Sequence, residues 1–121
     1  MPMITRLHIG PRLSEAAIAA GTVYLAGQVP EQNPDADIET QTREVLGHID
    51  RLLAECGSSK AHLLSVQIYL ADMGEIARMN TVWDAWVAPG HTPPRATVQA
   101  QLADPRWHIE VVVVARQITA A

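Results

Sequence analysis

Two charged residues near the end of the chain have the types and the setting needed for acid–base chemistry on a small anion. Arg95 opens a strand-like segment, and Glu110 interrupts the apolar run IEVVVVA at positions 109–115. Burying an unpaired ion is costly, so a charge in such a setting indicates a partner. An arginine fork grips a carboxylate at two points, and a half-buried glutamate can act as an acid or a base. The pair suggests a site where proton chemistry is done on a small anion.

Residues 92–116 are interpreted as a two-strand hairpin that carries both charges, with its turn near Asp104-Pro105. In that register Glu110 faces Gln99. The residues predicted to share one face of the sheet are Arg95, Thr97, Gln99 and Glu110. Arg95 would then lie roughly 13 Å along the strand from Gln99. A small substrate or a neighbouring subunit would have to fill that gap.

The rest of the pattern predicts the elements that position these residues. Strands are expected at 4–9, 16–20 and 22–29, with Gly27 inside the third marking a bulge or a close approach by backbone or ligand. Asp37 is the expected N-cap of a long helix that reaches Cys56 and is stopped by Gly57. Cys56 falls on the apolar stripe of that helix, which favours a buried spectator thiol over a nucleophile.

A further strand, 62–70, is expected to place alternate apolar residues on one face; these are Leu64, Val66, Ile68 and Leu70. Asp72 is predicted to cap a second helix and Glu75 to complete a capping box. Trp83 and Trp86 lie on that helix's apolar stripe, where a core position is more typical than a ligand platform. The helix is expected to end at Pro89-Gly90.

This order predicts an α+β fold in which two helices cover one face of a mixed sheet. The last strand is apolar on both sides, which is typical of a strand buried on both faces. The second cover would have to come from another copy of the chain. The pattern therefore predicts an oligomer.

Length, charge and cysteine content limit the classes of function. A chain of 121 residues with one continuous hydropathic pattern predicts a single domain, 1–121. The net charge of −4, with nine scattered basic residues, argues against nucleic-acid binding. No segment approaches a membrane span, and the single cysteine fits a reducing cytoplasm. The five histidines share no metal-ligand spacing, so no metal site is expected.

Six short motifs, in this order, resemble the Rid family, the YjgF-like reactive intermediate (enamine/imine) deaminases. They are Gly27–Pro30 (GQVP), Gln41–Arg43 (QTR), Leu70–Asp72 (LAD), Met79–Trp83 (MNTVW), Pro93–Val98 (PPRATV) and Ile109–Val111 (IEV). The resemblance implies a chorismate-mutase-like fold, assembled as a homotrimer with sites in clefts between subunits. It implies hydrolysis of 2-imino or 2-enamino acids to 2-keto acids and ammonia, without a metal or organic cofactor.

The resemblance also implies roles for individual residues. Arg95 matches the arginine that binds the substrate carboxylate, and Glu110 matches the acid that orients or activates water. Thr97 stands where many members have a cysteine that contributes mainly backbone contacts. Gly27 matches a strand glycine that lies against the substrate, and Asn80 matches a helix asparagine with a structural role.

Two positions depart from the family pattern, and other functions stay open. Many members have a tyrosine after Gly10-Pro11, where this chain has Arg12-Leu13-Ser14, and Val112 replaces a frequent second acid. His108 would share the face of Glu110 in a regular strand, where it would tune the site or belong to the surface. The alternatives are a non-catalytic metabolite-binding or chaperone-like trimer, a chorismate-mutase-type isomerase by analogy of fold alone, and a ribonuclease, which the acidity disfavours.

Overall fold

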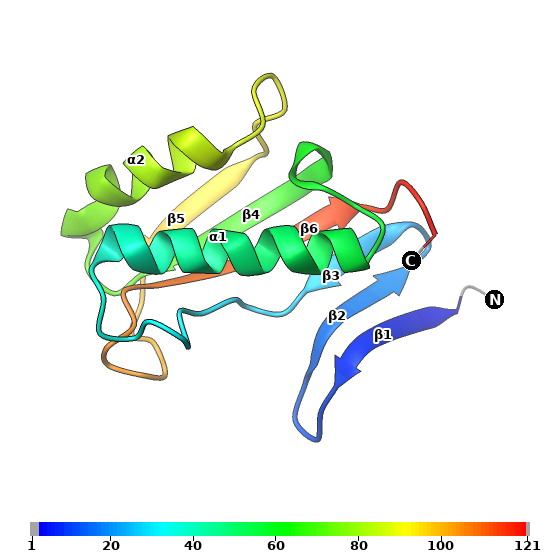
Figure 1. Ribbon diagram of the computed structural model, residues 1–121, viewed down its shortest axis with the longest axis horizontal. Coiled ribbons are helices and arrows are strands. Elements are labelled where there is room, and N and C mark those ends of the chain that lie inside the picture. The colour runs from blue at the N-terminus through cyan, green and yellow to red at the C-terminus, as the bar shows by residue number, and fades with distance from the viewer. Residues whose placement is uncertain (1–2, 121) are drawn as a thin grey trace.

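A computed structural model describes residues 3–120 as a six-stranded mixed sheet with two helices packed on one of its faces (Figure 1). The strands are β1 (Ile4–Ile9), β2 (Ser14–Ala19), β3 (Thr22–Leu25), β4 (Leu63–Leu70), β5 (Arg95–Gln99) and β6 (Ile109–Arg116). The helices are α1 (Ile38–Glu55) and α2 (Ile76–Trp86), with short 3₁₀ turns η1 (Lys60–His62) and η2 (Met73–Glu75). The predicted order of strands and helices is confirmed.

The predicted hairpin at 92–116 is wrong. The strand order in the sheet is β1-β2-β3-β6-β4-β5, so β4 lies between β5 and β6. The α2 crossover makes β5 a parallel neighbour of β4, and β6 pairs antiparallel with the other side of β4. The loop between β5 and β6 therefore crosses the end of β4 instead of making a tight turn. Strand propensity does not specify the pairing partner, because pairing depends on distant segments.

Helix α1 forms where the capping and hydropathic signals predict it. Asp37 Oδ1 accepts a hydrogen bond from Thr40 N at 3.0 Å, and Gly57, at φ +74°, follows the last turn. The apolar stripe packs on the sheet and is fully buried at Val45, Ile49 and Leu53. Cys56 is buried at the end of this stripe, and the loss of hydration raises the pKa of its thiol. That environment disfavours the reactive thiolate.

The start of α2 differs from the prediction. Asp72 accepts from Gly74 N at 2.8 Å and so caps the 3₁₀ turn η2, not α2 itself. Glu75 does not complete a capping box, because its Oε1 lies 2.6 Å from His108 Nδ1 at the start of β6. The helix ends at Trp86, before Pro89-Gly90. A tertiary contact has thus replaced the local one that the sequence suggested.

Strand β4 contains a register shift that changes which residues face the core. Leu63 is buried, whereas Leu64 is 49% exposed, contrary to the predicted alternation. The irregularity lies between Leu63 and Ser65 in the pairing with β6. An extra residue at a bulge moves the following side chains to the other face. From Val66 to Leu70 the expected alternation holds.

The face of the sheet away from the helices carries many apolar side chains. On β6 this face presents Glu110, Val112 and Val114, all only partly buried in a single chain. Exposed apolar residues elsewhere in the sheet include Tyr24 and Val98. Figure 1 shows both helices on the opposite side, with β1 and β2 extending beyond them. Neither described helix has the length and apolar character needed to cross a membrane.

Candidate functional site

Glu110 occupies the second position of β6, on the face away from the helices and opposite Tyr69 of β4. Its side chain is half-buried, and the loss of hydration raises its pKa, with no other contribution from residues 3–120. Its carboxylate makes no ion pair with any residue of the described range 3–120. A carboxyl group in this state can donate or accept a proton closer to neutral pH than an exposed one.

Gly27 lies directly against Glu110. A Cβ placed on Gly27 would collide with Glu110 Oε2, so any larger residue would push this carboxylate out of its present position. The next residue, Gln28, exchanges two backbone hydrogen bonds with Val111 at 2.8 and 3.1 Å. The close approach predicted at Gly27 is present, and the group that makes it is the side chain of Glu110.

Arg95 opens β5 and lies beside Val66 of β4 on the helix-covered face. Its Cζ atom lies 5.1 Å from the centre of the Trp83 ring on α2. Trp83 itself packs against Trp86, with 5.4 Å between ring centres. Arg95 forms no salt bridge within residues 3–120. The ring therefore supports the guanidinium by a cation–π contact, and the charge of Arg95 is not neutralised by an acid of residues 3–120.

Within one chain the structure does not bring Arg95 and Glu110 together. Arg95 pairs with Val66 and Glu110 pairs with Tyr69, three positions apart along β4 and so about 10 Å along the strand. Because side chains alternate between faces, an odd separation places the two residues on opposite faces of the sheet. The prediction that they share a face is wrong, since it depended on direct pairing of β5 with β6.

Thr97 and Asn80 each hold a buried polar atom without a partner. Thr97 lies on the same face of β5 as Arg95, and its Oγ1 makes no hydrogen bond within the described residues. Asn80 Oδ1 on α2 is also buried and has no hydrogen-bond partner within residues 3–120. An unsatisfied buried polar atom is costly, so each site favours a group that supplies the missing bond. The family resemblance implied mainly backbone contacts for the Thr97 position and a structural role for Asn80.

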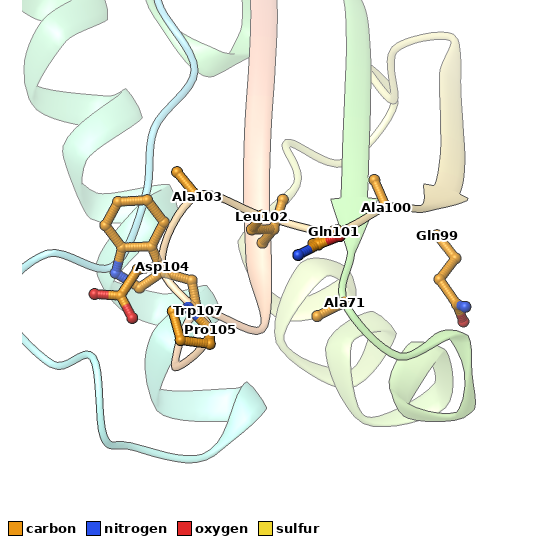
Figure 2. Close-up of a pocket in the computed structure, with 9 residues that line it drawn as sticks. All are labelled: Ala71, Gln99, Ala100, Gln101, Leu102, Ala103, Asp104, Pro105 and Trp107. Atoms are coloured by element: carbon orange, nitrogen blue, oxygen red, sulfur yellow. The ribbon is translucent and has the colours of Figure 1, made fainter.

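A hollow of about 610 Å³ lies under the loop that joins β5 to β6. Figure 2 shows its lining residues, with Asp104 and Trp107 at one end and Gln99 at the other. The one carboxylate in this lining, Asp104, is already bound by Arg106 at 2.8 Å, a contact that lowers its pKa. The residues that line this hollow include no cation that could bind an anionic ligand. Arg95 and Glu110 are therefore better candidates for the functional site than the hollow is.

The other residues considered in the sequence do not join Arg95 or Glu110 in a site. His108 precedes β6 and pairs with Glu75, so it does not lie beside Glu110 on a regular strand. Across residues 3–120 no group of three His, Cys, Asp or Glu side chains has the arrangement of a metal site. Sequence reasoning did not foresee the role of Gln41, which is fully buried and binds the chain just before β6. Gln41 is a polar residue on the otherwise apolar stripe of α1, and this position could have indicated a buried hydrogen-bonding role.

Comparisons with known proteins agree at the levels of sequence and structure. Residues 3–117 match the sequence profile of the family described as Endoribonuclease L-PSP. A RutC family protein from Haemophilus influenzae is 49% identical over 112 residues, which cover 93% of this chain and 97% of the relative.

Solved structures extend the match to the fold. A member of the YjgF protein family from Neisseria meningitidis is 51% identical with a TM-score of 0.93, covering 98% of each chain. A Rid family protein from Yersinia pestis is 28% identical with a TM-score of 0.81, covering 89% of each chain. Since the profile and these relatives match almost the whole chain, from the Gly27 strand to the Glu110 strand, the chain belongs to the Rid family, also named YjgF or RutC.

Proposed function

We propose that this protein hydrolyses reactive 2-imino and 2-enamino acids to 2-keto acids and ammonia. The observation that carries the proposal is the state of Glu110, a half-buried carboxylate with a raised pKa and no charged partner within residues 3–120. Arg95 supplies a cation whose guanidinium is held by an aromatic ring and not by an acid. An unpaired acid–base group and an unpaired anion receptor are the two parts that this reaction needs.

Arg95 binds the carboxylate of the imino acid through its planar fork. The contact with Trp83 restrains the guanidinium before substrate arrives, so less rotational freedom is lost on binding. The substrate carboxylate then orients the adjacent C=N bond. Thr97, two residues along β5, lies on the same face as Arg95 and offers a buried hydroxyl without a partner in the described chain.

Glu110 manages the protons of the hydrolysis. As a carboxylate it accepts a proton from water while the water oxygen bonds to the imine carbon and the C=N electrons move to nitrogen. As a carboxylic acid it returns that proton to nitrogen, which gives a carbinolamine. The regenerated carboxylate then takes the carbinolamine hydroxyl proton and passes it to nitrogen as the C=O bond forms and the C–N bond breaks, which releases ammonia and a 2-keto acid. A raised pKa suits both halves of the cycle, because the group must gain and lose one proton.

The complete site joins Arg95 of one chain to Glu110 of a neighbour in a homotrimer. One chain holds the two residues on opposite faces of its sheet, so it cannot present both to one small molecule. The partly buried valines on the Glu110 face give a second copy an apolar surface to cover. Three equivalent clefts would result, each bounded by two chains.

Two other functions are separable by experiment. A non-catalytic metabolite-binding trimer would keep Arg95 but would not depend on Glu110. The ribonuclease suggested by the description of the family profile needs a cationic surface, which a net charge of −4 and scattered basic residues do not favour. The unpaired Glu110 supports the deaminase over both.

The test measures ammonia release from imines made in situ by an amino-acid oxidase, against the spontaneous rate. Wild-type protein should accelerate release. Glu110→Gln should lose turnover, typically by about 10²–10⁴-fold, while still binding pyruvate or 2-ketobutyrate in calorimetry. Arg95→Ala should lose binding as well. Wild-type turnover in Glu110→Gln would show that Glu110 is structural and would exclude its acid–base role.

A further inference from the structure

Gln41 connects three segments of the chain through one buried amide. The residue belongs to α1 and has no exposed surface. The two N–H groups on its Nε2 are shared among the backbone carbonyls of Pro34, Ala36 and Arg106, at 3.0, 3.1 and 3.0 Å. Its Oε1 accepts from the backbone N–H of His108 at 2.7 Å. All four contacts are with backbone atoms outside the helix, so the amide ties α1 to two loops.

The bond to His108 fixes the chain two residues before Glu110. The side chain of His108 is held in addition by Glu75 of η2 at 2.6 Å. On the other side of Glu110, Val111 exchanges two backbone hydrogen bonds with Gln28. His108 O also accepts from Ala71 N at 3.0 Å. The chain is therefore anchored on both sides of Glu110, and Gln41 makes the bond to the His108 N–H among the contacts that hold the chain leading into β6.

We propose that Gln41 is a positioning residue that fixes the chain leading into β6 and thereby holds the Glu110 carboxylate against Gly27. Its effect on catalysis rests on the proposed deaminase function, whereas its effect on the position and hydration of Glu110 does not. The residue touches no substrate. It acts through the backbone of residues 106–108.

The chemistry of this position requires a side-chain amide. A glutamate would replace the donating NH₂ group with an oxygen facing three carbonyl oxygens, and it would bury a charge. An apolar side chain would leave those carbonyls and the His108 N–H without partners. Methionine has a similar length and no donor, so Gln41→Met removes the four bonds with little change in volume.

Thr42 provides a matched control. It is the next residue of α1, is 1% exposed, and its Oγ1 donates to Ile38 O at 2.7 Å within the helix. Thr42→Val removes one buried hydrogen bond without touching the loop at 106–108. The two variants therefore separate a general loss of stability from a loss of positioning.

The primary readout is the pKa of the Glu110 carboxyl group, followed by carbon NMR titration in the full-length protein. Its neighbour from β4 is Tyr69, Gly27 carries no charge, and no charged side chain of residues 3–120 pairs with it. Gln41→Met should lower this pKa toward its ordinary value, because a looser chain admits water. It should also reduce kcat by about 10- to 100-fold with little change in KM. Thr42→Val should lower only the melting temperature.

Hydrogen exchange of the wild-type protein gives a test that needs no variant. The His108 amide should exchange much more slowly than the amide of the exposed Ala103 in the same loop. Equal exchange rates, or an unchanged Glu110 pKa in a folded Gln41→Met protein, would overturn the proposal. If wild-type protein fails to hydrolyse imines while both readouts behave as expected, the deaminase function is wrong and the positioning role of Gln41 stands.

Discussion

At the scale of single residues, burial raises the pKa of Glu110, and the guanidinium of Arg95 lies over an aromatic ring. The proposed acid–base and anion-binding roles rest on these two features. Loss of hydration raises the pKa of Glu110, and no acid in the described part of the chain adds a charge repulsion. Trp83 supports the guanidinium of Arg95 without neutralising it. A salt bridge between the two residues would neutralise Arg95 and lower the pKa of Glu110. Because they do not pair within one chain, Arg95 keeps an unneutralised charge and Glu110 keeps its raised pKa.

Glu110→Gln should stabilise the fold at neutral pH. The folded state holds the Glu110 proton more tightly than the unfolded chain, so the free energy of unfolding falls as pH rises from about 4.5 through the raised pKa. Glutamine has no such penalty. Melting temperatures across the pH range should show an advantage for the variant at neutral pH that shrinks toward pH 4.5. An advantage that does not vary with pH would contradict this explanation.

Gly27→Ala should displace the Glu110 carboxylate, because the added Cβ collides with Oε2. We expect imine hydrolysis to fall by about 10- to 100-fold while the protein stays folded. Gly47→Ala in α1 is the control, since a Cβ there meets no atom within 4 Å. That change should add about 1 kcal/mol of stability and leave turnover intact. Equal turnover in the two variants would show that Glu110 tolerates displacement.

Arg95→Lys should weaken the binding of a 2-keto acid roughly tenfold or more, because an ammonium group lacks the planar two-point fork and stacks less well on Trp83. Calorimetry with pyruvate measures the change. Arg43→Lys, at an exposed position of α1, is the matched control and should bind as wild type does. Unchanged binding in Arg95→Lys would mean that Arg95 acts only as a point charge.

At the scale of elements, α1 organises the loops around the site as well as covering the sheet. Gln41 binds the loop before β6, and Glu44 one turn later binds the loop that precedes α1. Glu44 accepts from Gln32 N at 3.0 Å and from Asn33 N at 2.8 Å, and its Oε2 lies 2.8 Å from His48 Nε2. Burial alone would raise the pKa of Glu44, but these hydrogen bonds outweigh it and lower the pKa.

Glu44→Gln should destabilise the protein in a pH-dependent way. The charged form is favoured in the folded state, so its contribution is present above the ordinary pKa of 4.5 and is lost as pH falls through the lowered folded value. Denaturant unfolding at neutral pH should show a loss of about 1–2 kcal/mol. The difference in the free energy of unfolding between the variant and the wild-type protein should disappear at acidic pH. Glu31→Gln, at an exposed loop position, should change little at any pH.

At the scale of the whole molecule, the sheet has an uncovered apolar face that carries Glu110, while Arg95 lies on the covered side. Self-association therefore serves two purposes in the proposed mechanism. It buries the valines of β6, and it brings an arginine and a glutamate of different chains to one ligand. A single chain would have half of the machinery on each side of its sheet.

Light scattering should give about three times the chain mass of 13.2 kDa. Co-expression tests the shared site directly. Arg95→Ala and Glu110→Gln chains, each inactive alone, should recover activity when mixed, with about a quarter of the sites intact in a random one-to-one mixture. A stable monomer at micromolar concentration, or mixed trimers without recovered activity, would exclude a site built from two chains.

The sequence alone determined the features that depend on neighbours along the chain. The order of elements, the Asp37 cap, the stop at Gly57 and the burial of Cys56 follow from capping chemistry and hydropathic period. These features act over a few residues, so the printed sequence contains their causes. The same holds for Gly27, whose absent side chain indicated a close approach before the approaching group was known.

Tertiary structure decided which strands are neighbours, and that decision fixed the geometry of the site. Placing β4 between β5 and β6 sends Arg95 and Glu110 to opposite faces, because strand side chains alternate and an odd offset reverses the face. Tertiary structure also decided that the Glu75 side chain contacts His108 and does not cap its own helix. It likewise brought Gln41 into hydrogen-bonding contact with a loop far along the chain. Strand pairing balances contacts between distant segments against the entropy of closing the loops between them. The strand propensity of a local segment reports neither the contacts between distant segments nor the entropy of loop closure.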